Sequence, residues 1–472
     1  MNGFSEQHRA NTLWMMSLCI TLGLAWNLLP HPAIAVIAGV LPFAIVMVLR
    51  QPFLMVLLFV VFSFFRIHEV LPQLYNFKIP LLLSLASLAA LSWHIGITRK
   101  VRIYWRPEFT LITIFFVLTT IGVVAASNRP VAIEYFKAIY WKIMLMTFAI
   151  AWLTREAKDF SLASKLITIS GSLVGIVALM NKANGIGLVE GTRVTIGRDF
   201  GSVLGDPNDL ALVLMFPMSF AVALVMTPGL SKTTRWLGVI AALILFSAVI
   251  ATQSRGGLLG ILTILAVYGY RSIRSKTLLM VIAIVAMLAL YAVAGISERA
   301  SGGAAEDGID ASAMGRLYAW EAAIGMAASN PLTGVGLDNF YSNYYFYSPH
   351  WDGLNHAVHS TWFGVLAETG FLGLGVFIAM IVALIRTSQR SLTTIKARLD
   401  SVEPILYANA QAIQAGLYGT VVSGTFLTQG FTWPIYILAA LVVALAQWVD
   451  NRLMLEEQAD NCSHSAPTRT SP

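Results

Sequence analysis

The chain has 472 residues, of which 57% are hydrophobic and only 12% are charged. Soluble globular proteins carry about 25% charged residues, so this composition excludes an ordinary soluble domain. Runs of about 17–25 apolar residues can cross a bilayer, and such runs occur from end to end of the sequence. The net charge of +7 does not predict nucleic-acid binding, because the basic residues fall in the polar connections where membrane proteins place them.

The apolar runs determine the predicted fold. They lie at 12–29, 32–49, 53–66, 79–97, 109–126, 139–153, 162–181, 208–227, 236–253, 256–270, 277–295, 361–385, 405–427 and 432–448. We predict an all-α, polytopic transmembrane bundle of about 12 to 14 spans, in which the shortest runs are tilted or re-entrant. Its predicted parts are transmembrane helices within 1–295, a long loop at 296–360, further spans within 361–450 and a disordered tail at 451–472.

Basic residues predict the orientation of these spans. Lys and Arg are more frequent in the short connections on one side, such as 99–106, 271–276 and 386–398, and the positive-inside rule assigns that side to the cytoplasm. Both termini are then cytoplasmic, and the segments 181–207 and 296–360 lie on the outer face. Loops of this length are usually functional or disordered, so we expect the chemistry of the protein at the outer face.

The second half of the long loop carries a helical pattern. Apolar residues recur with helical spacing at Met314, Leu317, Tyr318, Ala322 and Met326. Asp310 or Ser312 is suited to cap the start of this helix, and Asn330-Pro331 is expected to end it. We expect the helix to lie on the membrane surface with its apolar face toward the lipid.

Arg255 is the first candidate for a functional residue. It lies in Ser254-Arg255-Gly256-Gly257 and interrupts two apolar runs, with no acidic residue nearby in sequence. An ionisable residue inside a membrane span indicates a functional site by default, and guanidinium matches phosphate oxygens well. The structural alternative is a tight-turn arginine whose side chain extends to the lipid headgroups.

Arg193 and Arg198 form a second candidate group in the segment 181–207. Two arginines on the outer side, where the positive-inside rule disfavours them, indicate an anionic ligand. The alternatives are headgroup contact, or pairing with Glu190 or Asp199.

His356 and His359 precede the apolar run that opens at Thr361. Histidine is the side chain most easily poised as a base near neutral pH, although both histidines could simply line a membrane interface. No carboxylate or cysteine lies at a matching spacing, so we expect neither a metal nor another cofactor. Glu368 is an intramembrane carboxylate that is expected to face a polar partner, and the glycines Gly334 and Gly336 are expected to form a turn.

Arginines and a histidine on one predicted face suit transfer from a lipid pyrophosphate. The leaving group departs with extra negative charge, which arginines stabilise electrostatically. A base then takes the proton from the attacking hydroxyl.

Four short motifs and the long loop together resemble the O-antigen ligase and O-antigen polymerase superfamily of the Wzy-C type, over roughly residues 110–450. The motifs are Asp206–Ala211, Ser254–Gly257, Gly334–Phe340 and the pair His359–Trp362 and Leu366–Leu374. The segment Asp310–Arg316, followed by Ala319 and Trp320, is similar to the branch of exosortase-associated O-glycosylation ligases. Ser360 follows the loop histidine where the family usually has Asn, and that branch shares the departure.

The resemblance implies an inverting, metal-independent glycosyltransferase in the bacterial inner membrane with a periplasmic active site. The donor would be a glycan on undecaprenyl pyrophosphate, and the acceptor lipid A core or another periplasmic molecule. By motif, His359 would be the base and Arg255 a pyrophosphate ligand. Arg193 or Arg198 would be the second arginine, Arg316 would organise the loop, and His356 is a weaker candidate.

Two other functions stay open at this point. An O-antigen polymerase would need the same donor site, so the donor motifs do not separate it from a ligase. A transporter of anions such as bicarbonate would suit an arginine-lined vestibule, but transporters usually carry polar groups through the midplane of the membrane. The candidates here cluster at one face, which favours transfer.

Overall fold

The computed structural model describes residues 16–17, 20, 23, 32–293 and 311–464. In this part of the chain every regular element is a helix, and the extended pairing is limited to one isolated bridge between Val189 and Arg193. The predicted all-α class is therefore confirmed. Most of the predicted first run at 12–29 and the first part of the long loop, 296–310, lie outside the described residues.

The long helices account for most of the described chain. They are α2 (Pro32–Arg50), α3 (Pro52–Phe64), α5 (Ile79–Ser92), α6 (Pro107–Ala125), α8 (Trp141–Leu153), α9 (Ala157–Asn184), α10 (Pro207–Met226), α11 (Lys232–Thr252), α12 (Arg255–Ser272), α13 (Lys276–Val293), α14 (Ala311–Ser329), α16 (Thr361–Lys396), α17 (Pro404–Gly424) and α18 (Trp433–His464). Shorter helical elements connect them: α4 (Ile67–Val70), η1 (Pro72–Phe77), η2 (Trp93–Ile97), α7 (Arg129–Tyr135), η3 (Phe136–Tyr140), η4 (Arg198–Phe200), η5 (Val203–Gly205) and α15 (Phe340–Tyr347).

Fewer helices of the described residues meet a length and apolarity criterion for spanning than the roughly 12 to 14 spans predicted, and most of the first predicted run lies outside the described residues. Among the described residues, eight helices are long and apolar enough to cross a membrane, or nine if α2 and α3 count as one span bent by 99°. The predicted runs at 256–270 and 405–427 form α12, of 18 residues, and α17, of 21 residues, which are long enough but are not among the helices apolar enough to cross. α17 carries buried Asn409, Gln411 and Gln414, so its polar side chains face other helices and lower its mean hydropathy.

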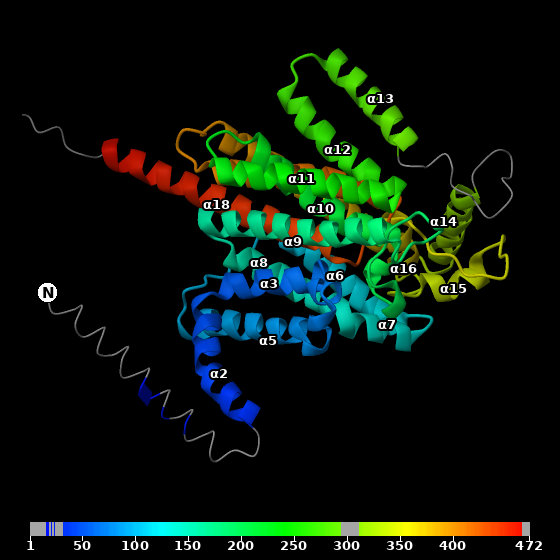
Figure 1. Ribbon diagram of the computed structural model, residues 1–472, viewed down its shortest axis with the longest axis horizontal. Helices are drawn as coiled ribbons and strands as arrows, with labels where there is room; N and C mark the ends of the chain where they lie inside the picture. The colour runs from blue at the N-terminus through cyan, green and yellow to red at the C-terminus, as the bar shows by residue number, and fades with distance from the viewer. Residues whose placement is uncertain (1–15, 18–19, 21–22, 24–31, 294–310, 465–472) are drawn as a thin grey trace, which may run out of the picture.

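The centre of the bundle is formed by α10 and α18. In their most apolar stretches, 83% of the α10 residues and 78% of the α18 residues are buried inside the protein. A helix that is apolar all round is suited to such a central position. Around this centre, α3, α5, α9 and α11 run in broadly the same direction, and α14 and α15 lie beyond one end of the bundle (Figure 1).

Several helices begin or end together near α14, and we call this part of the molecule the His359 end. Here α9 and α11 end, and α10, α12 and α16 begin. Hydrogen bonds join these termini: the amide of Val194 donates to the carbonyl of Ala251, and Thr361 Oγ1 donates to the carbonyl of Leu427. The segments that the sequence assigns to one face of the membrane therefore do gather at one end.

The helix predicted in the long loop is present as α14, which ends at Ser329 as expected. The direction of its apolar face differs from the prediction, because part of this face packs against other helices of the protein and not toward lipid. Ala319, Ala322 and Met326 are buried in a small core with residues of α15 and α16, whereas Leu317 is 46% exposed. The alanines allow a close approach between helices that the apolar spacing alone does not reveal.

The last helix is also longer than predicted. α18 continues from Trp433 to His464, so the first part of the predicted tail at 451–472 is helical. Residues 465–472 lie outside the described residues.

Candidate functional site

Asn208 joins three segments at the His359 end. Its side-chain oxygen Oδ1 accepts hydrogen bonds from Arg193 Nη2 and from Ser254 Oγ, both at 3.0 Å. Asn208 lies in the first turn of α10, where Asp206 caps the helix by accepting from the backbone amide of Asn208 at 2.7 Å. Arg193 also donates from Nε to the carbonyl of Thr252, at 3.2 Å. The segment 189–196, the start of α10 and the turn between α11 and α12 are thus held together.

Arg255 is the first residue of α12. The start of this helix packs so closely on α10 that no side chain fits at Gly257. Ser254 caps the helix by accepting from the amide of Gly257, and Gln253 before it has a left-handed φ of 51°. A Cβ atom on Gly257 would lie 2.6 Å from the Cβ of Ala211 in α10. Real contacts of this kind do not occur, so the glycine permits α12 to begin directly against α10. Arg255 is half-buried at this junction.

His359 lies in a strained backbone conformation immediately before α16. Its φ is 44°, a left-handed value that costs a non-glycine residue energy and is concentrated at functional sites. Trp320 of α14 donates from Nε1 to the carbonyl of Val358, at 3.1 Å, and stacks on Phe363 with ring centroids 4.8 Å apart. The segment that carries His359 is therefore fixed between α14 and α16.

Charges from four segments act on His359. Burial is the main cause that lowers its pKa below the ordinary value of 6.5, and the positive charges of Arg316 and Arg193 lower it further. The negative charge of Asp206 acts in the opposite direction, while His356 adds a small lowering effect. A lowered pKa leaves the imidazole neutral near pH 7, and a neutral imidazole can accept a proton.

The structure separates the two arginines that the sequence could not distinguish. Arg193 is 7% exposed and is among the charges that act on His359. Arg198 lies on the short turn η4, is exposed, and donates from Nη1 to the carbonyl of Gly205 at 3.3 Å. Of the two, Arg193 is the one that belongs to the cluster around Asn208.

His356 has a local partner. Its Nε2 lies 3.0 Å from Asp352 Oδ2, and its ring packs edge-on against Tyr344 with centroids 5.4 Å apart. The hydrogen bond from His356 lowers the pKa of Asp352. His356 thus lies near His359 but is held by its own carboxylate.

Glu368 and the glycine motif hold the long loop on α16. The Glu368 carboxylate accepts from the backbone amides of Asp338 at 3.0 Å and Phe340 at 3.3 Å, so the predicted polar partner is the loop backbone. Gly334 has a φ of +60°, and a Cβ there would lie 2.3 Å from the carbonyl oxygen of Ala367. The expected turn is confirmed, and its function is to dock the loop.

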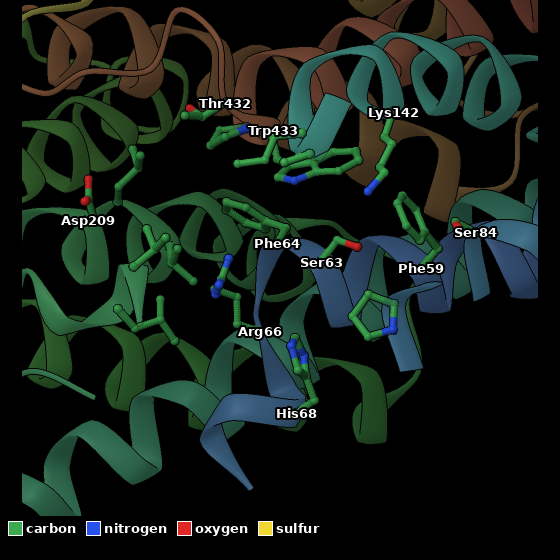
Figure 2. A pocket seen from close by; sticks show the side chains of 18 of the residues that line it. Phe59, Ser63, Phe64, Arg66, His68, Ser84, Lys142, Asp209, Thr432 and Trp433 are labelled. Carbon is green, nitrogen blue, oxygen red and sulfur yellow. The ribbon is translucent and has the colours of Figure 1, made fainter. Parts of the chain in front are cut away.

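A cavity of about 580 Å³ opens beside the start of α10 (Figure 2). Lys142 and Arg66 reach into it from opposite sides, and Phe59, Phe64 and Trp433 supply its aromatic wall. Its other polar lining residues are Ser63, His68, Lys78, Ser84, Tyr135, Asp209, Thr428 and Thr432. The cavity thus combines basic side chains with an aromatic and apolar wall.

Not all of this positive charge is available to a ligand. Arg66 pairs with the buried Glu69, with Nη2 at 2.6 Å from Oε1, and burial lowers the pKa of His68. Among the described residues, Lys78 and Lys142 are therefore the basic side chains of the cavity for which no acidic partner is found. The cavity also reaches Asp209, which neighbours the Asn208 that binds Arg193 and Ser254.

The sequence interpretation did not identify Asn208, Trp320 or the basic cavity residues as parts of a site. Arg66, Lys78 and Lys142 all fall on the side that the sequence predicts to be external, where basic residues are disfavoured, and this is a usable signal. Asn208 lies within a quoted motif, but its two hydrogen bonds depend on tertiary packing. In the described part of the chain, no three His, Cys, Asp or Glu side chains form a group that could hold a metal ion.

Residues 240–378 match the family model described as O-Antigen ligase, Wzy_C, which is a family of enzymes. The match begins within α11 and ends within α16. It includes Arg255, Arg316, His356 and His359, whereas Arg193 and Arg198 precede it. A comparison with curated proteins found no match.

Proposed function

We propose that this multi-pass membrane protein, which contains an O-antigen ligase domain, transfers a glycan from undecaprenyl pyrophosphate to a hydroxyl of an acceptor on the periplasmic face of the bacterial inner membrane. The observation that carries the proposal is the position of His359. It has a lowered pKa and a left-handed backbone, and it lies among Arg316, Arg193 and Asp206. A neutral base surrounded by arginines suits a reaction that releases a pyrophosphate.

In the proposed reaction, His359 takes the proton of the acceptor hydroxyl as its oxygen attacks the anomeric carbon of the donor sugar. A new glycosidic bond forms with inversion, and the bond from that carbon to the pyrophosphate oxygen breaks. Undecaprenyl pyrophosphate leaves with the electron pair. Arg255 and Arg316 stabilise its increased negative charge, while Arg193 positions the start of α10 and keeps the pKa of His359 low. No metal is required.

We assign the donor lipid to the cavity of Figure 2. Lys78 and Lys142 would bind the phosphates, and the wall of Phe59, Phe64 and Trp433 would hold the first part of the polyprenyl chain. Pockets of this kind bind ligands by an apolar lining with a few polar groups that fix orientation. The contact with the start of α10 would bring the pyrophosphate toward the His359 cluster.

The proposal is tested with full-length protein in proteoliposomes supplied with a defined undecaprenyl-pyrophosphate glycan. H359A should abolish transfer while the protein stays inserted, whereas H350A should retain it, because His350 is exposed and stacks on Tyr318 in the same loop. K142Q should raise the KM for donor, and K137Q should not, since Lys137 is exposed and lies outside the cavity lining. Wild-type transfer by H359A would overturn the assignment of the base.

The acceptor decides between ligase and polymerase. We propose a ligase of the exosortase-associated branch, because two residues of the similarity to that branch act beside His359: the charge of Arg316 lowers the pKa of His359, and Trp320 donates to the carbonyl of Val358. Parallel reactions should contain lipid A core, a periplasmic protein acceptor or a second lipid-linked glycan. Product formed only from two lipid-linked glycans would show a polymerase instead.

A further inference from the structure

The structure contains a second cavity, of about 720 Å³, at the end of the bundle opposite His359. It is formed by the end of α10, the end of α12, the end of α16 and the start of α17. α12 begins at Arg255, so Arg271 lies about 24 Å farther along the helix axis at 1.5 Å per residue. The proposed transfer site does not use this cavity.

The cavity is lined by cations, tyrosines and amides. Its polar lining residues are Tyr270, Arg271, Ser272, Gln389, Thr393, Lys396, Tyr407, Gln411, Gln414 and Tyr418. Among the described residues, no Asp or Glu belongs to the lining. Every polar side chain of the lining can thus donate a hydrogen bond and two are positively charged, while none is acidic, and this suits an anion.

Arg271 supplies the observation that points to a ligand. Its Nη2 donates to Gln414 Oε1, and Gln414 in turn donates to Gln389. Its Nη1 is buried and has no hydrogen-bond partner among the described residues. A buried guanidinium nitrogen without a partner has given up its hydrogen bonds to water and gained none in return, which destabilises the folded protein. A bound anion that accepts a hydrogen bond from Nη1 would remove this desolvation penalty.

The other wall of the cavity is apolar, with Met226, Val267, Leu392, Leu399 and Val402. We propose that this cavity binds a phosphate group, with Arg271 and Lys396 as its cationic ligands. Guanidinium matches phosphate oxygens, and basic pockets between transmembrane helices bind phospholipid headgroups. The phosphate can come from a membrane lipid, whose acyl chains would lie on the apolar wall, or from solution.

The test measures the thermal stabilisation of purified full-length protein in detergent by three probes. These are inorganic phosphate, dioctanoyl phosphatidylglycerol, and dioctanoylglycerol, which has the same chains without a phosphate. We expect the phosphate-bearing probes to raise the Tm. Stabilisation by the lipid alone identifies a headgroup site, and stabilisation by both shows that free phosphate suffices. Equal stabilisation by dioctanoylglycerol, or none by either phosphate probe, would overturn the proposal.

The variants locate the effect. R271Q should raise the phosphate concentration that gives half of the maximal Tm shift by at least about tenfold. The reason is that a hydrogen bond to a charged group is worth roughly 1.5–3 kcal/mol. K396Q should weaken it as well, and it keeps the hydrogen bond between Arg271 and Gln414 if R271Q fails to fold. R274Q is the matched control, since Arg274 is exposed and outside the lining. Undiminished stabilisation in folded R271Q and K396Q would refute the site, whatever the outcome for His359.

Discussion

The indole of Trp320 donates a hydrogen bond to the carbonyl of Val358 at 3.1 Å, one residue before His359. This contact crosses from α14 to the segment that precedes α16. It fixes the residue before His359, whose own φ of 44° is unfavourable without support. Trp320 is therefore a positioning residue for the proposed base.

We predict that W320F lowers kcat for transfer by roughly fivefold, because the substitution removes one hydrogen bond worth about 1 kcal/mol. The phenyl ring can still stack on Phe363, so the KM for donor should not change. Steady-state kinetics in proteoliposomes separate the two constants. W351F serves as the control, since Trp351 is 45% exposed in the same loop and packs on Tyr345. A change in KM alone would show that Trp320 acts on donor binding.

The pH dependence of transfer should follow the neutral form of His359. Because its pKa is lowered, activity should be retained below pH 6.5 and lost as the pH falls through the lowered pKa. Removing the positive charge in R316Q should raise this pKa, so the acidic limb moves to higher pH. Removing the negative charge in D206N should move it to lower pH, while the amide oxygen still caps α10.

These shifts are measured as initial rates from pH 5 to pH 8, normalised to the plateau of each variant. R198Q is the matched control, because Arg198 is exposed and is not among the charges that lower or raise the pKa of His359. Acidic limbs that coincide in R316Q, D206N and wild type would mean that another group limits the rate.

The sequence predicts the fold class, because apolar runs are a property of the chain itself, and it names Arg193, Arg316 and His356, whose charges act on His359 in the structure. Apolar runs such as 405–427 do not separate helices that contact lipid from helices that pack among other helices, and α17 carries buried polar side chains that lower its mean hydropathy. The expectation that the apolar face of α14 turns toward lipid is wrong for Ala322 and Met326, because helical spacing does not reveal that these residues pack against other helices of the protein.

The details of the site depend on contacts between residues far apart in sequence. Arg193 and Arg198 are indistinguishable by composition, and the two hydrogen bonds on Asn208 Oδ1 separate them only once α10 and α12 have packed. The same holds for the basic cavity, whose walls include residues of α3, α5, α8, α10 and α18.

N208A should weaken both the fold and the site. It removes the acceptor shared by Arg193 and Ser254, and a buried donor left without a partner costs about 1–3 kcal/mol. We expect a lower Tm and a lower transfer rate than wild type. N208D should retain more stability, because its carboxylate can accept from both donors and pairs with the charge of Arg193. N184A, at the exposed end of α9, is the control, and equal Tm values for N208A and N184A would contradict the prediction.

Gly370 is the position where α16 departs from helical geometry to receive the long loop. Its φ is 70° and its ψ is −172°, and the amide of Phe371 donates to the carbonyl of Pro331 at 2.8 Å. A Cβ on Gly370 would lie 2.4 Å from that same carbonyl oxygen. G370A must therefore move the loop away from α16, and it adds backbone strain of about 1–3 kcal/mol.

We predict that G370A lowers the Tm and the transfer rate together, because the displaced loop carries the segment that leads to His359. G375A provides a matched control five residues along the same helix, where a Cβ meets no atom within 4 Å. There alanine should preserve or raise stability, by up to about 1 kcal/mol, through its higher helix propensity. Thermal unfolding and transfer assays of the two variants test this prediction. A G370A protein as stable and active as G375A would show that docking of the loop does not require the non-helical backbone at Gly370.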